Sequence, residues 1–203
     1  EEIKQLGELG FLGMMTDPKY GGGGMDTVSY ALAMEEISKI DASTSVCMSV
    51  NNSLVCWGLE RFGSEEQKQK YLVPLAKGEI LGAFCLSEPE AGSDATSQRT
   101  TAIDKGDYYL VNGTKNWITN GNSASVYLVI CQTDVEKKHR GINALIIERG
   151  MEGFKVGAKE VVALRYQTLP SKWVYPGPPG FQRAETIELV PTIWPLTVIV
   201  PLL

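Results

Sequence analysis

Apolar residues recur at helical spacing through the first part of the chain. In residues 1–10 they fall at every third position, and a second such stretch runs to residue 40 from Asp26 or Thr27, either of which can cap a helix N-terminus. Residues 17–24 lie between them and contain Asp, Pro and four glycines, which is the composition of a loop. The pattern therefore predicts two helices joined by a loop.

A third helix is predicted in the interior of the fold. Residues 42–59 contain no charged side chain, yet the stretch is too long for a typical strand and too rich in Ser and Asn for a membrane span. A helix surrounded by other helices fits best. Asn51 and Asn52 then need partners inside, because an unpaired buried amide costs about 1–3 kcal/mol. Ser64 with Gln67 forms a capping-box pattern that begins the next helix.

After residue 78 the pattern changes to short runs of β-prone residues. These runs are residues 80–86, 100–103, 108–111, 116–119, 126–131 and 142–147. Residues 104–107 and 112–114 between them have the Gly and Asn content of hairpin turns. We therefore expect a helical block followed by an antiparallel β block, with a boundary near residue 78.

Composition narrows the kind of protein. Of the 203 residues, 43% are hydrophobic and 21% charged, which is typical of a soluble globular chain. A net charge of −5 argues against a nucleic-acid partner, because phosphate binding needs a basic face. The single histidine, His139, stands among basic residues and the four cysteines are far apart, so neither a zinc site nor a Ser-His-Asp triad is indicated.

Two segments concentrate groups that a ligand could use. In residues 84–94 a strand leads directly into Ser, Glu, Pro, Gly and Asp, so hydroxyls and free backbone amides gather at a strand end. In residues 113–120, Thr119 follows Trp117 on the same strand face, and this pair could cover an aromatic ring and hydrogen-bond its edge. Taken singly, a polar turn and a buried structural tryptophan explain the two segments better.

Together the two segments resemble the acyl-CoA dehydrogenase family, which carries a pattern like L/V-S/T-E-P-x-x-G-S-D followed by N-G-x-K-x-W-I-T-N. Residues 86–94 read LSEPEAGSD and residues 112–120 read NGTKNWITN. Upstream, YGG at 20–22 and AMEEI at 33–37 are similar to the short-chain, butyryl-CoA-type branch. The resemblance covers residues 1 to about 160.

The resemblance implies an α+β fold and a flavin cofactor, FAD. It implies an N-terminal all-helical domain at 1–78 and an antiparallel β-barrel-like middle domain at 79–160 that contacts the flavin. Trp117 would shield one flavin face, the Ser87 hydroxyl would meet its polar edge, and Ser93 would reach the pyrophosphate or the acyl-CoA substrate. The residues expected to bind FAD are Phe84, Cys85, Leu86, Ser87, Gly92, Ser93, Trp117, Ile118 and Thr119.

The resemblance also implies an activity, the α,β-dehydrogenation of an acyl-CoA, with short chains expected. A carboxylate removes the α proton, the β hydride passes to the flavin, and electrons leave through an electron-transfer flavoprotein. The uncharged helix at 46–59 would line the acyl-chain pocket, and ordinary core packing explains it equally well. The family forms homotetramers. The bacterial cytoplasm and the mitochondrial matrix both fit cysteines that stay reduced.

The resemblance ends after residue 160. Residues 161–203 hold seven of the ten prolines, which would break the helices of the family's C-terminal bundle, and residues 187–203 are too short and too rich in proline to span a membrane. We expect this bundle to be absent and residues 161–203 to be a non-homologous tail, disordered or an artefact of translation or assembly. Since the bundle carries the family's catalytic base, no catalytic residue is assigned. The chain alone is expected to be inactive, to bind FAD weakly or not at all, and not to assemble as the family does.

Two other interpretations stay open on the sequence. A flavin-dependent acyl-CoA oxidase or a nitroalkane-oxidase-like enzyme would differ in oxygen access and in its base. A protein without catalytic activity could use the helical and β blocks as a binding module.

Overall fold

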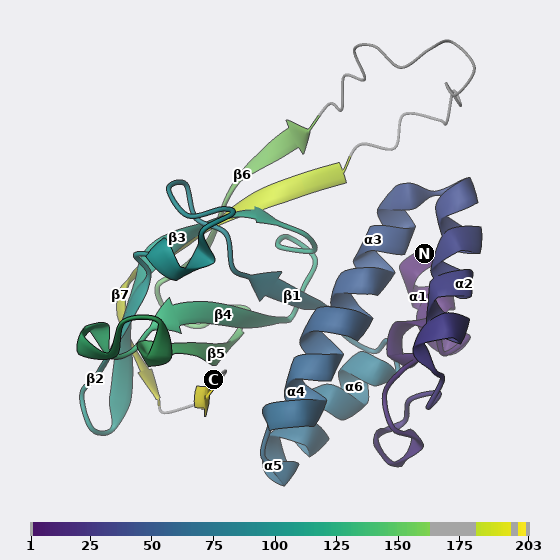
Figure 1. The fold of residues 1–203 in the computed structure, drawn as a ribbon, viewed down its shortest axis with the longest axis horizontal. Helices are drawn as coiled ribbons and strands as arrows, with labels where there is room; N and C mark the ends of the chain where they lie inside the picture. Colours follow the sequence, from purple (N-terminus) through teal and green to yellow (C-terminus); the bar gives the residue numbers. More distant parts are fainter. Residues whose placement is uncertain (1, 163–181, 196–198, 202–203) are drawn as a thin grey trace.

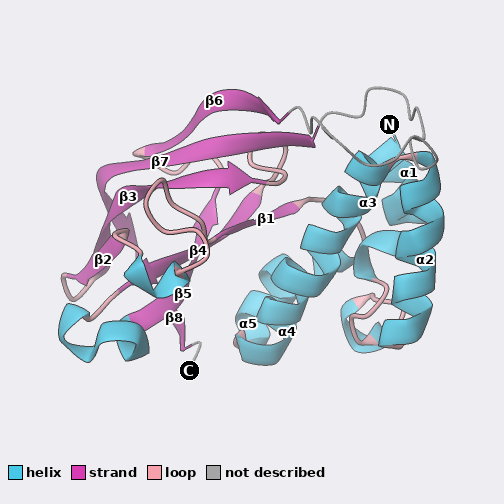
Figure 2. Ribbon diagram, turned by 45° about the horizontal axis from the view of Figure 1, so that its top comes forward, coloured by secondary structure: helices cyan, strands magenta, loops and turns pink. Residues whose placement is uncertain are grey.

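A helical block and a β-sheet lie side by side in this protein (Figure 1). The computed structural model describes residues 2–162, 182–195 and 199–201. In a second view the helices again gather on one side and the strands on the other (Figure 2). Within the described ranges, the helical segments that follow the first strand are two short ones, η5 (Ala95–Ser97) and η6 (Val135–Gly141). The predicted α+β class is confirmed.

One long helix forms the centre of the helical block. The block consists of α1 (Glu2–Glu8), η1 (Phe11–Gly13), η2 (Pro18–Tyr20), α2 (Thr27–Ile40), α3 (Ala42–Ser49), η3 (Val50–Cys56), α4 (Trp57–Phe62), α5 (Glu65–Gln67), η4 (Lys68–Leu72) and α6 (Val73–Ala76). Segments α3, η3 and α4 follow one another without a break, and η3 is wound as a π-helix. The helix predicted from the uncharged stretch is therefore confirmed.

The helix ends are closed by the side chains that the sequence indicated. Asp26 accepts a hydrogen bond from Ser29 N at 2.8 Å, at the start of α2. Ser64 Oγ accepts from Gln67 N at 3.2 Å, and Gln67 Oε1 accepts from Ser64 N at 2.8 Å, which completes the capping box of α5. Local sequence therefore decides where these helices begin.

Asn51 joins the helical block to the sheet. Its side chain is fully buried, and its amide nitrogen donates to Leu12 O at 2.9 Å and to Leu75 O at 3.2 Å. Its amide oxygen accepts from Gly82 N at 3.0 Å, at the start of the first strand. Asn52 also donates to two backbone carbonyls. The Asn51 amide is therefore paired at both ends, as the cost of an unpaired buried amide requires, whereas the buried Asn52 Oδ1 accepts no hydrogen bond.

The sheet is largely antiparallel. Its strands are β1 (Gly82–Cys85), β2 (Thr101–Asp104), β3 (Tyr108–Ile118), β4 (Val126–Gln132), β5 (Ile142–Glu148), β6 (Phe154–Val162), β7 (Gln182–Pro195) and β8 (Ile199–Pro201). Their order is β6-β7-β3-β2-β4-β5-β8, and β1 pairs with β4 in parallel, with Gly82 opposite Val126. The predicted turn at 104–107 joins β2 to β3, and Lys105 N donates to Tyr108 O at 2.9 Å.

The turn predicted at residues 112–114 is wrong. β3 runs through these residues as one strand, with a register shift against β7 between Val111 and Gly113. Position 113 requires a glycine because Thr100 approaches it closely. A Cβ at this position would lie 2.2 Å from Thr100 Oγ1. The glycine allows two segments of backbone to meet, and the chain does not reverse.

Trp117 has a strained backbone near the end of β3. Its φ is +61°, a left-handed conformation that is uncommon for a bulky residue, and its side chain is 53% exposed. A second register shift against β7 lies between Lys115 and Ile118. These two residues, both buried, flank the strained position and hold it in place. Such strain costs about 1–3 kcal/mol and is found preferentially at functional sites.

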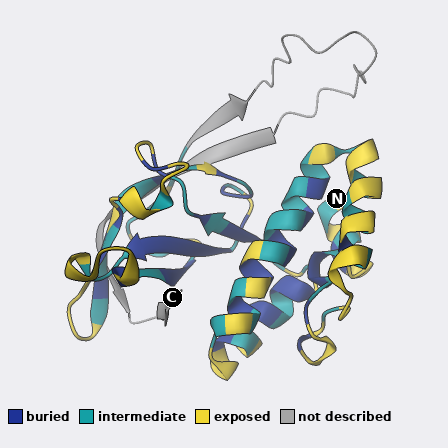
Figure 3. Cartoon of the chain, viewed as in Figure 1, coloured by how far each residue is buried: buried dark blue, intermediate teal, exposed yellow. Residues whose placement is uncertain are grey.

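The helices and the sheet share one apolar core. Val55, Leu59 and Leu72 from the helical block pack in one cluster with Val126 and Leu128 of β4. Exposed residues gather on the outer face of α2, while β4 is buried along its length (Figure 3). Since the helical block and the sheet share this cluster, packing does not mark a boundary between them. The domain limits at residues 78 and 160 therefore stay predictions.

Polar side chains also connect the two blocks. Glu148 at the end of β5 accepts a hydrogen bond from the Tyr71 hydroxyl at 2.6 Å and pairs with Lys70 Nζ at 2.8 Å, both from η4. The hydrogen bonds from Lys70 and Tyr71 hold the pKa of the Glu148 carboxyl below its ordinary value.

The tail predicted at 161–203 is described only in part. Residues 163–181, 196–198 and 202–203 lie outside the described residues, and residues 182–195 and 199–201 form β7 and β8. Disorder or an artefact there stays a prediction. Among the described residues, no helix has the length and apolar character needed to cross a membrane.

Replacing Glu148 by Gln should make the free energy of unfolding depend less on pH in the acidic range. The folded pKa of Glu148 is lowered, so its contribution is complete above the unfolded value of 4.5 and is lost as the pH falls through the folded value. We expect the free energy of unfolding to fall less steeply below pH 4.5 in Glu148→Gln than in the wild type, measured by denaturant titration across the pH range. Glu152→Gln, an exposed carboxylate with no ion pair among the described residues, is the control. Parallel slopes for Glu148→Gln and wild type would contradict the ion pair.

The strained backbone at Trp117 predicts that Gly is more stable than Ala at this position, which is the reverse of the usual order. At an ordinary strand position Gly is less stable than Ala by about 0.5–1 kcal/mol. In a left-handed position Ala retains the steric cost, so we expect Trp117→Gly to be more stable than Trp117→Ala by about 1 kcal/mol in thermal unfolding. Ile103 in β2 is 49% exposed with a negative φ, and it should show the ordinary order. If Ala were the more stable at residue 117 as well, the strain would be disproved.

Candidate functional site

The first motif leaves the sheet at the end of β1 and folds into a tight turn. Glu88 N donates to Ala91 O at 2.9 Å, and Ala91 N donates to Glu88 O at 3.2 Å. Beyond the turn Gly92 and Ser93 are exposed, whereas Ser87 before it is half-buried. The motif therefore exposes a short polar loop beside the edge of the sheet.

The second motif lies directly against the first. Asn116 N donates to Ser87 O at 2.8 Å, and Lys115 Nζ donates to Leu86 O at 2.9 Å. Residues 29 positions apart in the sequence are thus joined twice, once between backbone atoms and once through the Lys115 side chain. The strand end that carries Ser87 and the strained residue Trp117 belong to one local unit.

A buried ion pair lies beneath this unit. Lys115 Nζ is 2.7 Å from Glu88 Oε1, and the two side chains are 0% and 5% exposed. Gln98 Oε1 accepts a third hydrogen bond from Lys115 Nζ at 3.2 Å. The Glu88 carboxylate also accepts from Arg99 N at 2.5 Å and from Thr100 N at 3.0 Å. Taking a charge out of water costs several kcal/mol, so every donor of the ammonium has to be matched, as it is here.

The electrostatics of the pair follow from this arrangement. Burial by itself raises the pKa of Glu88, but the hydrogen bonds from Lys115, Thr100 and Arg99 outweigh it and hold the pKa of this carboxyl below its usual range. Burial lowers the pKa of Lys115, and the hydrogen bond to Glu88 offsets part of that effect. Each partner keeps the other ionised, because removal of either charge would leave a lone buried one.

The predicted FAD-binding residues divide into two groups. Phe84, Leu86, Ser87 and Thr119 are half-buried, and Ser93 and Trp117 are exposed. The hydroxyls of Ser87, Ser93 and Thr119 have no hydrogen-bond partner among the described residues, so they remain free for a ligand. Cys85 and Ile118 instead turn into the core of the sheet, which leaves only their backbone atoms for contact. At Gly92 an added Cβ would meet nothing within 4 Å in this chain.

Sequence reasoning missed Glu88, Gln98 and Lys115 as parts of the site. A weak signal was available, since Lys115 is the one charge of the second motif and the first motif carries only acidic charges, at Glu88, Glu90 and Asp94. Pairing them requires knowing that the segments touch, and their separation along the chain does not show this. Gln98 carries no signal of its own.

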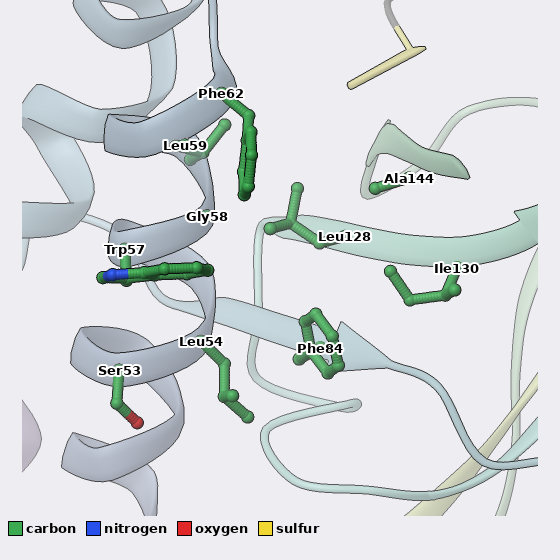
Figure 4. A pocket seen from close by; sticks show the side chains of 10 residues that line it. All are labelled: Ser53, Leu54, Trp57, Gly58, Leu59, Phe62, Phe84, Leu128, Ile130 and Ala144. Atoms are coloured by element: carbon green, nitrogen blue, oxygen red, sulfur yellow. The ribbon is translucent and has the colours of Figure 1, made fainter. Parts of the chain in front are cut away.

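An apolar pocket lies between the long helix and the sheet (Figure 4). It has a volume of about 150 Å³. Leu54, Trp57 and Phe62 line it from the helix, and Phe84, Leu128 and Ile130 line it from the strands. Trp57 and Phe62 pack edge to face, with ring centroids 5.7 Å apart and an angle of 83°. The pocket therefore has an aromatic wall on the helix side.

A second pocket shares Phe84 and Ile130 with the first. Its volume is about 490 Å³, and Leu86, Gln98 and His139 also line it. The two pockets thus adjoin at Phe84, in the first motif. Among the described residues that line them there is no aspartate or glutamate. The pockets can hold an extended ligand with an apolar end, and their described walls supply no carboxylate to accept a proton.

Comparison with known proteins identifies both blocks of the chain. A family model described as "Acyl-CoA dehydrogenase, N-terminal domain" matches residues 1–79. A second, described as "Acyl-CoA dehydrogenase, middle domain", matches residues 83–173. The two together account for most of the chain.

Individual proteins give the same result. The chain is 46% identical over 160 residues to a short-chain specific acyl-CoA dehydrogenase of Clostridium acetobutylicum, covering 79% of this chain and 42% of that protein. The structure of butyryl-CoA dehydrogenase from Megasphaera elsdenii matches with a TM-score of 0.83 and 38% identity, covering 98% of this chain and 49% of that one. A glutaryl-CoA dehydrogenase from Mycobacterium smegmatis in complex with FADH2 matches with a TM-score of 0.81 and 34% identity, covering 100% and 47%.

The chain spans less than half the length of each of these relatives. Within that span both the order of the domains and the two motifs agree with the family. The resemblance seen in the sequence is thereby confirmed, and the chain belongs to the acyl-CoA dehydrogenase family, of which it carries the N-terminal and middle domains.

Proposed function

We propose that this chain supplies the FAD-binding and acyl-CoA-binding surfaces for the α,β-dehydrogenation of a short-chain acyl-CoA. The observation that carries the proposal is the hydrogen bond from Asn116 N to Ser87 O, which brings the two motifs into one unit. When bound, FAD would accept the β hydride of the thioester and pass electrons to an electron-transfer flavoprotein. The residues of this chain would bind and orient cofactor and substrate.

The exposed groups of this unit suit an aromatic ligand with a polar edge. Trp117 presents a half-exposed indole, which could cover one ring face. The hydroxyls of Ser87 and Thr119 are free to hydrogen-bond the ring edge, and that of Ser93 to hydrogen-bond the pyrophosphate or the substrate. The residues present therefore fit FAD. We assign to its contact surface Phe84, Cys85, Leu86, Ser87, Gly92, Ser93, Trp117, Ile118 and Thr119.

The two pockets suit the parts of a short-chain acyl-CoA. The pocket of about 150 Å³ is small, and the side chains that line it are almost all apolar. This matches a short acyl chain. The second pocket reaches His139, whose sequence neighbours Lys137, Lys138 and Arg140 are exposed and basic. An exposed basic segment next to a pocket-lining residue would favour the phosphates of coenzyme A.

The proton acceptor is the part of the reaction that the described pocket walls do not supply. We therefore propose that the chain alone has no dehydrogenase turnover and binds FAD weakly or not at all. All four cysteines are free, which agrees with the bacterial cytoplasm or the mitochondrial matrix as its compartment.

A chimeric enzyme tests this proposal. Residues 1–160 would replace the matching residues of the Megasphaera elsdenii butyryl-CoA dehydrogenase, and FAD binding and butyryl-CoA turnover with a dye acceptor would be measured. We expect both to be retained by the chimera, and we expect no turnover by the 203-residue chain alone. A folded chimera that neither binds FAD nor oxidises butyryl-CoA would contradict the proposal.

Within the chimera, Ser87→Ala and Thr119→Val should each weaken FAD binding about tenfold. One lost hydrogen bond is worth about 1 kcal/mol or somewhat more, and 1.4 kcal/mol corresponds to a factor of ten. Titration with FAD, followed by the quenching of flavin fluorescence, gives the affinities. Ser123→Ala removes an exposed hydroxyl from the loop after β3 and should leave the affinity unchanged. Equal affinities in all three variants would remove these two hydroxyls from the site.

A further inference from the structure

The Lys115 ammonium hydrogen-bonds three separate points of the segment at residues 86–98, which contains the first motif. Its acceptors are Leu86 O at 2.9 Å, Glu88 Oε1 at 2.7 Å and Gln98 Oε1 at 3.2 Å. Because an ammonium has three donors and no acceptor, all of its hydrogen-bonding capacity is used. Lys115 thus holds the start, the turn and the end of the exposed loop from a single buried point.

Glu88 closes the same loop from the other side. Its carboxylate accepts from Arg99 N at 2.5 Å and from Thr100 N at 3.0 Å, where the chain returns toward β2. A pair of apolar side chains could fill the same volume, and replacing buried ion pairs in this way is often neutral or stabilising. A gain in stability is therefore a weak reason for burying charges here.

The consequence falls on the peptide group between Leu86 and Ser87. Its carbonyl accepts from Lys115 Nζ, and the next carbonyl, Ser87 O, accepts from Asn116 N at 2.8 Å. Both peptide groups that flank the Ser87 side chain are held in this way. A cation bound to a carbonyl also polarises the peptide and makes its N–H a stronger donor. Among the described residues, the Ser87 N–H has no acceptor of its own.

Lys115 also fixes the second motif. It lies two residues before Trp117, whose left-handed backbone is flanked by the buried Lys115 on one side and the buried Ile118 on the other. Removing the anchor at Lys115 would free the strand to relax toward an ordinary β conformation. The indole would then change its position relative to Ser87.

We propose that Lys115, held by Glu88, is a positioning residue that sets the Ser87 peptide and the Trp117 ring in their ligand-binding geometry before any ligand binds. The proposal rests on the proposed function for the identity of the ligand, FAD. The positioning itself is a property of the chain without ligand. It can therefore be measured on the 203-residue protein as it is.

Amide hydrogen exchange and amide resonances of the isotope-labelled chain provide the test. In Lys115→Met we expect the amides of Asn116, Arg99 and Thr100 to exchange at least tenfold faster, while the amides of β4 and β5 keep their protection. We also expect the Ser87 amide proton to move upfield, since its peptide is less polarised. Lys115→Arg keeps the charge and should retain most of both properties.

Two further variants make the result decisive. Lys70→Met removes the lysine of another ion pair, with Glu148, and should leave the Ser87 and Asn116 amides unchanged. If Lys115→Met fails to fold because Glu88 is left unpaired, the double variant Glu88→Gln/Lys115→Met carries neither charge and takes its place, with the same expected changes. A folded variant with wild-type exchange at Asn116 and an unmoved Ser87 resonance would overturn the positioning role.

Adding FAD to the butyryl-CoA dehydrogenase chimera, with and without Lys115→Met, separates the two proposals, because the chain alone is expected to bind FAD weakly or not at all. Resonances of Ser87 and Trp117 that move with FAD in the chimera and not in its Lys115→Met variant support both. If they move equally in the two proteins, positioning by Lys115 is overturned although the flavin site stands. If FAD moves them in neither protein while the exchange difference persists, the proposed flavin site is contradicted and the positioning role is supported.

Discussion

The ammonium of Lys115 lies buried where the end of β1, the turn after it and the start of β2 meet, and Glu88 neutralises it there. A charge in that position cannot be left without partners, so one backbone carbonyl, Leu86 O, and the side chains of Glu88 and Gln98 have to supply acceptors at fixed places. The exposed loop at 86–97, the approach of β3 and the strained backbone at Trp117 all surround this one point. The polar half of the candidate site is therefore built on an electrostatic constraint.

The apolar half has a different origin. The long helix from α3 to α4 packs on β1 and β4 through Val55, Leu59 and Leu128, and Asn51 hydrogen-bonds the helix to Gly82 at the start of β1. Helix and strand are thus held at a set distance. The pocket next to Phe84 is the space left between their side chains (Figure 4). Phe84 belongs both to this pocket and to the first motif, so the two halves of the site meet at one residue.

Much of the local structure could be predicted from the sequence. The caps at Asp26 and Ser64 and the turn at 104–107 depend on neighbours a few residues away, and the structure agrees with all three. The turn expected at 112–114 failed for an instructive reason. A glycine serves equally in a turn and at a close approach of two strands, and here Thr100, a residue distant in sequence, is what requires it.

By itself the sequence determined the helical and β blocks, the helix that had to be buried, and the two motifs whose order indicated the family. These follow from periodicity, charge and short-range hydrogen bonding, all of which act between near neighbours in the chain. Only the tertiary structure decided that Glu88 pairs with Lys115, that Gln98 joins them, and that Trp117 takes a left-handed backbone. Those features arise where segments many residues apart are packed against each other. Their energies depend on burial, which no local pattern of residues specifies.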